Sequence, residues 1–218
     1  MPESPSPPTP ITIGIDIGGP SKGFHAVALK DGRYHAKLAS KDIAELAQWS
    51  VHTMGATVMA IDAPCGWSKT DRCRQAERAL MQQGIFCFAT PTEATAAAKP
   101  FYNWMLQGKA LYDALAPTHP IRDPRAPGRT RYCFETFPHA ITWHLQGGVA
   151  SAKRKRTERR ALLERLGIDL KELTNIDTVD AALCAYVAHL AATEAPLQAY
   201  GEMATGLIVV PSAPSGSV

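Results

Sequence analysis

Hydrophobic residues alternate strictly with small or polar ones over residues 11–19. Isoleucine occupies every odd position from 11 to 17, and Asp16 lies among the small residues of the even positions. Alternation with a period of two, made by β-branched residues, predicts a strand with one buried face. A carboxylate on such a strand is costly unless it is paired, solvated at a cleft or bound to a metal. Asp16 is therefore the first candidate functional residue.

Further apolar segments have the lengths and spacings of strands and helices. Strands are expected at residues 24–29, 34–39, 57–62 and 131–138, and helices at 43–54, 69–83, 94–115, 140–145, 161–166 and 181–192. Asp31-Gly32 is typical of a tight hairpin, which predicts an antiparallel meander of the first three strands. The fourth strand has almost no polar residue before Asp62, as in strands buried on both faces. Residues 207–210 form either a sixth strand or a packed extension.

The segments between these elements define the domain organisation. A length of 218 residues predicts a single domain, placed at residues 11–210. A Pro-rich lead at residues 1–10 and a tail at 211–218 have the composition of disordered termini. Residues 65–130 have a weaker pattern with many prolines, so they are expected to be an insertion that forms a lid or a substrate platform.

Composition argues against several classes of protein. The chain is 45% hydrophobic and 20% charged, which suffices for a normal core, and no apolar run approaches the length of a membrane span. The first ten residues lack the basic start and apolar middle of a secretory signal. The five cysteines are scattered and form no Cys-x-x-Cys pair, so a zinc site is not expected. Reduced thiols in a cytoplasmic protein are the simpler interpretation.

Acidic residues fall where predicted strands end and where the last helix begins. Besides Asp16 they are Asp62, Glu135, Asp177 and Asp180. Asp177 and Asp180 share one helix face because they are three residues apart. Magnesium prefers oxygen ligands, and two such ions can clamp the attacking and leaving oxygens of a phosphodiester displacement. The four aspartates are therefore candidate catalytic residues and ligands of Mg²⁺ or Mn²⁺, with Glu135 as a further catalytic candidate.

Each of these residues also has a purely structural interpretation. Asp177 and Asp180 suit the cap and first turn of a helix. Asp62 suits the cap of a turn, and Glu135 suits an ion pair with an arginine. His139 follows the fifth strand, where it is either a general base beside the metal or a helix cap.

Basic residues are clustered, although the net charge is only +3. Six of the eight residues at 153–160 are Lys or Arg, and a second basic stretch covers residues 122–131. Such a cluster either contacts a phosphate backbone or forms a solvated helix face. The candidate substrate-binding residues are Lys153, Arg154, Lys155, Arg156, Arg74, Arg78 and Trp67. Among aromatic residues, Trp67, Tyr102 and Trp104 are expected to face a cleft, where rings can stack bases.

The order of elements and several short motifs resemble known proteins. Three strands, a helix, a fourth strand, an insertion and an acidic last helix resemble the ribonuclease H-like superfamily. Within it, Asp177-Thr-Val-Asp-Ala181 resembles the last-helix motif of RuvC-type resolvases. The chain is more similar to the domain of unknown function 429 family, predicted nucleases of that fold. The resembling segments are residues 13–16, 60–64, 72–78, 134–138 and 177–181, whereas the family's Gly-Trp after the first turn is Gly23-Phe24 here.

The resemblance implies an α/β protein with a ribonuclease H-like fold. Its mixed five-stranded sheet has strands one to three antiparallel and strands four and five parallel, and is flanked by helices. The implied function is a metal-dependent nuclease that hydrolyses phosphodiester bonds of DNA or RNA by a two-metal carboxylate mechanism. A homodimer is an open alternative to a monomer.

Two other functions remain open. Residues 13–19 resemble the first phosphate loop of actin-like and sugar-kinase phosphotransferases and ATPases. Those folds consist of two related domains, and the chain has no second copy of the strand set. The other alternative is a non-catalytic nucleic-acid-binding or adaptor protein on the same fold, in which the acidic residues serve only as caps.

Overall fold

A computed structural model describes residues 10–19, 21–70, 72–126, 128 and 130–213 of the chain. The predicted lead lies outside the described residues except for Pro10, and the predicted tail except for residues 211–213. Within the described ranges, no helix is long and apolar enough to cross a membrane. All five cysteines are described, and each is a free thiol.

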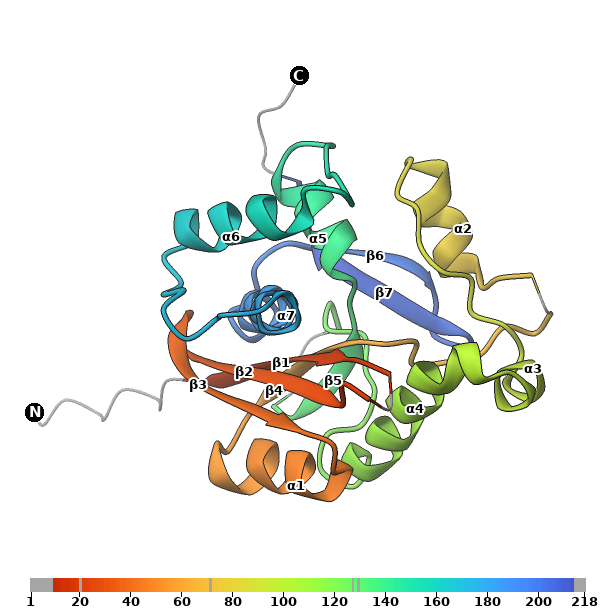
Figure 1. The fold of residues 1–218 in the computed structure, drawn as a ribbon, viewed down its shortest axis with the longest axis horizontal. Coiled ribbons are helices and arrows are strands. Elements are labelled where there is room, and N and C mark those ends of the chain that lie inside the picture. Colours follow the sequence, from red (N-terminus) through yellow and green to blue (C-terminus); the bar gives the residue numbers. More distant parts are fainter. Residues whose placement is uncertain (1–9, 20, 71, 127, 129, 214–218) are drawn as a thin grey trace, which may run out of the picture.

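Over the described residues, the strands form one mixed sheet of seven strands in the order β3-β2-β1-β4-β5-β7-β6 (Figure 1). They are β1 (Ile11–Ile17), β2 (Phe24–Lys30), β3 (Arg33–Ser40), β4 (Val58–Asp62), β5 (Tyr132–Glu135), β6 (Leu197–Glu202) and β7 (Gly206–Pro211). The first three strands form the predicted antiparallel meander. β4, β5 and β7 continue the sheet in parallel from β1, and β6 closes the edge in the antiparallel direction.

The α/β class and the parallel pair β4–β5 are confirmed, but the count of five strands is wrong. The chain adds β7 and β6 beyond β5. β7 is the late apolar segment at residues 207–210, so the strand interpretation of that segment holds. β6 is harder to detect because it is a partly exposed edge strand and contains Gly201, whose φ of +98° is unusual for a strand.

Helices cover both faces of the sheet (Figure 1). They are α1 (Ile43–Gln48), a π-helical turn (Trp49–Thr53), α2 (Gln75–Gln82), α3 (Glu93–Ala98), a 3₁₀ turn (Pro100–Tyr102), α4 (Asn103–Leu115), α5 (Pro138–Leu145), α6 (Lys155–Arg165) and α7 (Ile176–Ala192). α1 and α4 pack into the hydrophobic core of one face, and α5, α6 and α7 into that of the other. The helix expected at residues 94–115 is divided at Pro100, because proline has no N–H to continue the helical hydrogen bonds.

β1 is buried on both faces, which corrects the expectation of one solvated face. Its isoleucine face packs against Leu46 of α1 and Leu111 of α4. The opposite face, with Thr12 and Gly14, is covered by α7. A Cβ at Gly14 would lie 2.0 Å from Ala181 O and from Ala185 N, so the helix touches the strand backbone itself. The small residues at the even positions of β1 therefore make room for α7.

This contact places the first turn of α7 beside the carboxyl end of β1. The N-cap of α7 is Asn175, whose side chain accepts a hydrogen bond from Thr178 N at 2.8 Å. Asp177 and Asp180 are therefore not the caps of this helix. Both carboxylates lie near Asp16 instead, and the positive end of the helix dipole favours negative charge at this place.

Replacing Gly14 with alanine should lower the free energy of unfolding by about 3 kcal/mol or more, because the new Cβ meets backbone atoms that cannot rotate away. Gly19→Ala is the matched control, since nothing lies within 4 Å of a Cβ placed there. Urea denaturation of both variants measures the difference. Equal stabilities would contradict the close contact between β1 and α7.

Candidate active site

Two aspartates meet at the carboxyl ends of neighbouring parallel strands. Asp16 of β1 is directly opposite Asp62 of β4 in the sheet register. The carboxyl ends of parallel strands are where open α/β sheets place their ligand sites. Asp177 and Asp180 of α7 join them, so the structure brings together the four aspartates predicted from the sequence.

The four aspartates line one cleft with a volume of about 420 Å³. Its basic side chains come from the turn after β1 and from α6, and its aromatic side chains come from residues 65–130 and from the segment after β5. These residues are Lys22, Lys155, Arg159, Phe88, Trp104 and Phe137. The cleft thus combines acidic, basic and aromatic groups contributed by several elements.

Burial and mutual repulsion raise the pKa of three of the four carboxylates, which therefore resist ionisation. Burial raises the pKa of Asp16 well above its ordinary value, and Asp62, Asp180 and Asp177 raise it further. Burial and Asp180 raise the pKa of Asp62 to about 8, against the opposing effect of Arg159. Burial also raises the pKa of Asp180 above its ordinary value, although Arg159 opposes this shift. A cation entering the cleft would relieve these repulsions.

Protein cations already balance the two aspartates of α7. Lys22 Nζ donates to Asp177 Oδ1 at 3.0 Å and to Oδ2 at 3.2 Å. Arg159 Nη1 donates to Asp180 Oδ1 in a buried ion pair. Arg159 is only 5% exposed, and its Nε is buried with no hydrogen-bond partner among the described residues.

The donor set suits magnesium in its chemistry but not as a preformed cage. Among the described residues, no group of three or more His, Cys, Asp or Glu side chains is arranged to hold a metal ion. The acidic residues that line the cleft are all aspartates, whose oxygens suit Mg²⁺ or Mn²⁺ rather than zinc. A bound metal would compete with Lys22 for Asp177 and with Arg159 for Asp180.

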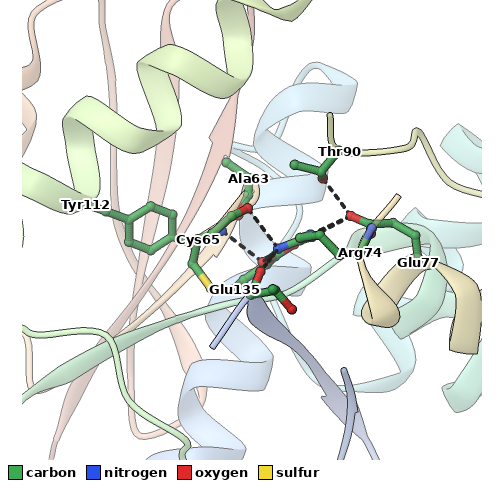
Figure 2. A network of polar contacts seen from close by, with 9 residues as sticks. Ala63, Cys65, Arg74, Glu77, Thr90, Tyr112 and Glu135 are labelled. Carbon is green, nitrogen blue, oxygen red and sulfur yellow. Dashed lines mark hydrogen bonds and ion pairs between the residues drawn. The ribbon is translucent and has the colours of Figure 1, made fainter. Parts of the chain in front are cut away.

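Glu135 does not line this cleft, because Arg74 holds it in a buried network (Figure 2). Arg74 Nη2 and Nη1 donate to the two Glu135 oxygens at 2.6 and 2.8 Å, and Cys65 N donates to Glu135 Oε2 at 2.9 Å. Arg74 Nε also donates to Glu77 Oε1 at 2.7 Å, and Thr90 donates to the same oxygen. The ion-pair interpretation of Glu135 describes its position.

Because of this network, the Arg74 side chain is buried. Its side chain is 1% exposed, so it cannot reach a nucleic-acid backbone as a candidate substrate contact would. Arg78, one turn further along α2, is exposed. Trp67 is half-buried and does not line the cleft.

The basic segment reaches the cleft through one residue that was predicted, Lys155, and one that was not, Arg159. Lys155 lines the cleft, and so does the buried Arg159 one turn later. Lys153 and Arg154 are exposed, and Arg154 pairs with Glu158 at 3.1 Å. Arg156 donates to Thr174 O at 3.3 Å. In the other basic stretch, Arg125 pairs with Asp123 at 2.8 Å.

His139 is half-buried near the basic side of the cleft without lining it. Burial lowers its pKa, and Arg159 lowers it further. The imidazole is therefore neutral near pH 7, as a general base must be.

Four basic or aromatic residues of the cleft were not candidates from the sequence: Lys22, Arg159, Phe88 and Phe137. Arg159 has the clearest signal, because it follows Lys155 by four residues on the same helix face. Lys22 lies in a turn, and its partner Asp177 is 155 residues away, so no local pattern reveals the pair.

The structure and the cleft define an α/β protein with a polar site at the carboxyl ends of its parallel strands. A family model described as "protein of unknown function (DUF429)" matches residues 14–205, so the chain belongs to this family. Comparison with curated proteins and with solved structures gave no match.

Arg74→Met should destabilise the fold by about 3–5 kcal/mol, because the substitution leaves Glu135 and Glu77 buried without their cation. Arg78→Met is the matched control on the exposed side of the same helix, and should change stability by less than about 0.5 kcal/mol. Chemical denaturation measures both. Similar losses in the two variants would show that the buried network is not what stabilises this region.

Metal-free protein should lose stability as the pH rises. The pKa of Asp62 is higher in the folded protein than its ordinary 3.8, so the folded state binds this proton more tightly. The resulting stabilisation is complete below pH 3.8 and is lost as the pH rises through about 8.

In chelator at about pH 9, Asp62→Asn should therefore have a melting temperature several degrees above that of the wild type. For a domain of this size, about 1 kcal/mol of stability corresponds to roughly 2–4 °C in melting temperature. Asp113→Asn, which removes an exposed carboxylate paired with Lys109, should follow the wild-type pH profile. Melting curves from about pH 5 to about pH 9 test this. Parallel profiles for wild type and Asp62→Asn would contradict it.

Proposed function

We propose that the protein is a metal-dependent nuclease of ribonuclease H-like fold that hydrolyses phosphodiester bonds of DNA or RNA. One observation carries the proposal. Four aspartates from β1, β4 and α7 line a single cleft that also contains Lys155 and Arg159. Carboxylates suit the metal, and the basic side chains suit the phosphate.

The topology supports the fold assignment. An antiparallel meander is followed by parallel β4 and β5, and the last helix packs across β1 with its acidic first turns beside Asp16. This order is what the resemblance to the ribonuclease H-like superfamily implies. β7 and β6 extend that arrangement at the edge next to β5.

In this proposal Asp16, Asp62, Asp177 and Asp180 hold Mg²⁺ or Mn²⁺. When bound, the metal would neutralise the carboxylates, activate a water and stabilise charge on the phosphate oxygens. Arg159 and Lys22, released from Asp180 and Asp177, are then placed to bind phosphate at the same cleft. Glu135 holds Arg74 and takes no part in the chemistry.

A phosphotransferase is less well supported by the turn after β1. Backbone N–H groups that would cradle a phosphate are used within the turn itself. Gly18 N donates to Gly23 O at 2.8 Å, and Lys22 N and Gly23 N donate to Gly19 O at 2.9 and 3.0 Å. A phosphate loop of the actin-like or sugar-kinase type needs such groups free.

Mg²⁺ or Mn²⁺ should raise the melting temperature of the wild type, because an ion that binds only the folded state stabilises it by about 2.7 kcal/mol at 100 times its Kd. Asp180→Asn should abolish most of this shift, and Asp113→Asn, which does not line the cleft and is paired with Lys109 at the surface, should keep it. Differential scanning fluorimetry with a metal titration measures the shift.

The same three proteins should then be incubated with labelled single-stranded, duplex and branched DNA and RNA. We expect metal-dependent cleavage by the wild type and by Asp113→Asn, and a loss of at least about 100-fold in Asp180→Asn. A metal shift that survives Asp180→Asn would refute the metal site. A metal shift without cleavage of any substrate would favour the adaptor.

A further inference from the structure

Three phenylalanines of the segment between β4 and β5 are exposed, which is unusual for such large apolar rings. Phe86, Phe88 and Phe101 are 76%, 67% and 60% exposed. Two of them belong to one group: the Phe88 and Phe101 ring centroids are 5.7 Å apart, and those of Phe101 and Tyr102 are 5.0 Å apart, both edge to face. We call Phe88, Phe101 and Tyr102 the aromatic ridge. Exposed apolar groups of this kind mark binding surfaces.

The aromatic ridge adjoins the acidic cleft. Phe88 lines the cleft together with Trp104 of α4, which follows Tyr102 by two residues. Phe137, after β5, adds a third ring to the lining. Aromatic surface thus continues from the outer rings to the side chains that surround the four aspartates.

The loop that carries Phe88 is anchored at both ends. Ile85 is completely buried, and so is Thr90, whose hydroxyl donates to Glu77 at 2.6 Å. Glu77 is in turn bound by Arg74, which holds Glu135 at the end of β5 (Figure 2). The buried network therefore fixes the loop against the sheet with Phe88 beside the cleft.

From this arrangement we infer that the aromatic ridge stacks the unpaired bases of a single-stranded nucleic acid whose backbone enters the acidic cleft. The inference rests on the proposed nuclease function and names its substrate class. Exposed rings offer faces to bases that are not already stacked in a duplex. Charge complementarity supports the same ligand, because Lys155 lines the cleft and Lys153 and Arg154 are exposed on the adjoining segment.

The inference is tested by binding, kept separate from cleavage. Fluorescence anisotropy with Ca²⁺ in place of Mg²⁺, so that the carboxylates can bind a hard cation while cleavage is suppressed, measures the affinity of the wild type for labelled single-stranded DNA and RNA and for the matched duplexes. We expect single strands to bind at least about tenfold more tightly than duplexes. Phe88→Ala and Phe101→Ala should each weaken single-strand binding by on the order of tenfold, since one stacked ring contributes about 1–3 kcal/mol.

Phe86→Ala is the matched control. This ring is the most exposed of the three and lies on the same loop as Phe88, yet it neither lines the cleft nor contacts another aromatic ring among the described residues. Its removal should change the affinity by less than about twofold. All three variants remove exposed side chains and should melt within about 2 °C of the wild type.

Three results would overturn the inference: duplex bound as tightly as single strands, unchanged binding by the Phe88→Ala Phe101→Ala double variant, or an equal loss in Phe86→Ala. Cleavage assays with metal separate this inference from the nuclease proposal. If the double variant cleaved duplexes as fast as the wild type, the proposed nuclease function would stand and the role of the aromatic ridge would be refuted. If single-strand binding required Phe88 but no substrate were cleaved, the role of the aromatic ridge would stand and the proposed nuclease function would be refuted.

Discussion

The contact between β1 and α7 is the constraint on which the site depends. Because Gly14 has no side chain, the backbone of α7 rests on the backbone of β1. The first turn of the helix then lies over the end of the strand, and Asp177 and Asp180 reach Asp16. A larger residue at position 14 would push α7 away from β1 and separate the carboxylates. The arrangement of the cleft therefore depends on packing in the core.

The second organising element is a buried arginine. Arg74 contacts the end of β5 through Glu135, the loop before α3 through Glu77 and Thr90, and the turn before β7 through Thr205 O. Burying a guanidinium is costly unless its donors are satisfied, and here carboxylates and carbonyls satisfy them. Residues 65–130 are therefore fixed to the sheet by charge as well as by apolar packing, which allows them to present aromatic rings at the cleft.

Much of this arrangement was accessible from the sequence. Alternation in β1, the apolar run of β4 and the spacing of Asp177 and Asp180 predicted the positions of the four aspartates, because strand ends and helix faces follow from local pattern. The pairs Lys22–Asp177 and Arg159–Asp180 and the choice of Arg74 as the partner of Glu135 were not accessible in the same way. Their partners lie far away in sequence, and which arginine meets which carboxylate is decided by tertiary packing. The edge strand β6 was not predicted, because Gly201 and the exposed positions of this strand are typical of a loop.

The position of Arg74 also bears on how the molecule unfolds. The strands β7 and β6 lie outside the five-stranded arrangement expected from the sequence and could be taken for a removable appendage. Yet Thr205 O accepts a hydrogen bond from Arg74 Nη1 at 3.3 Å, and Gly206 lies so close to the same atom that a Cβ there would be 2.5 Å from it. Detaching this hairpin would admit water to the buried ion pair. The edge of the sheet and its centre therefore form one cooperative unit.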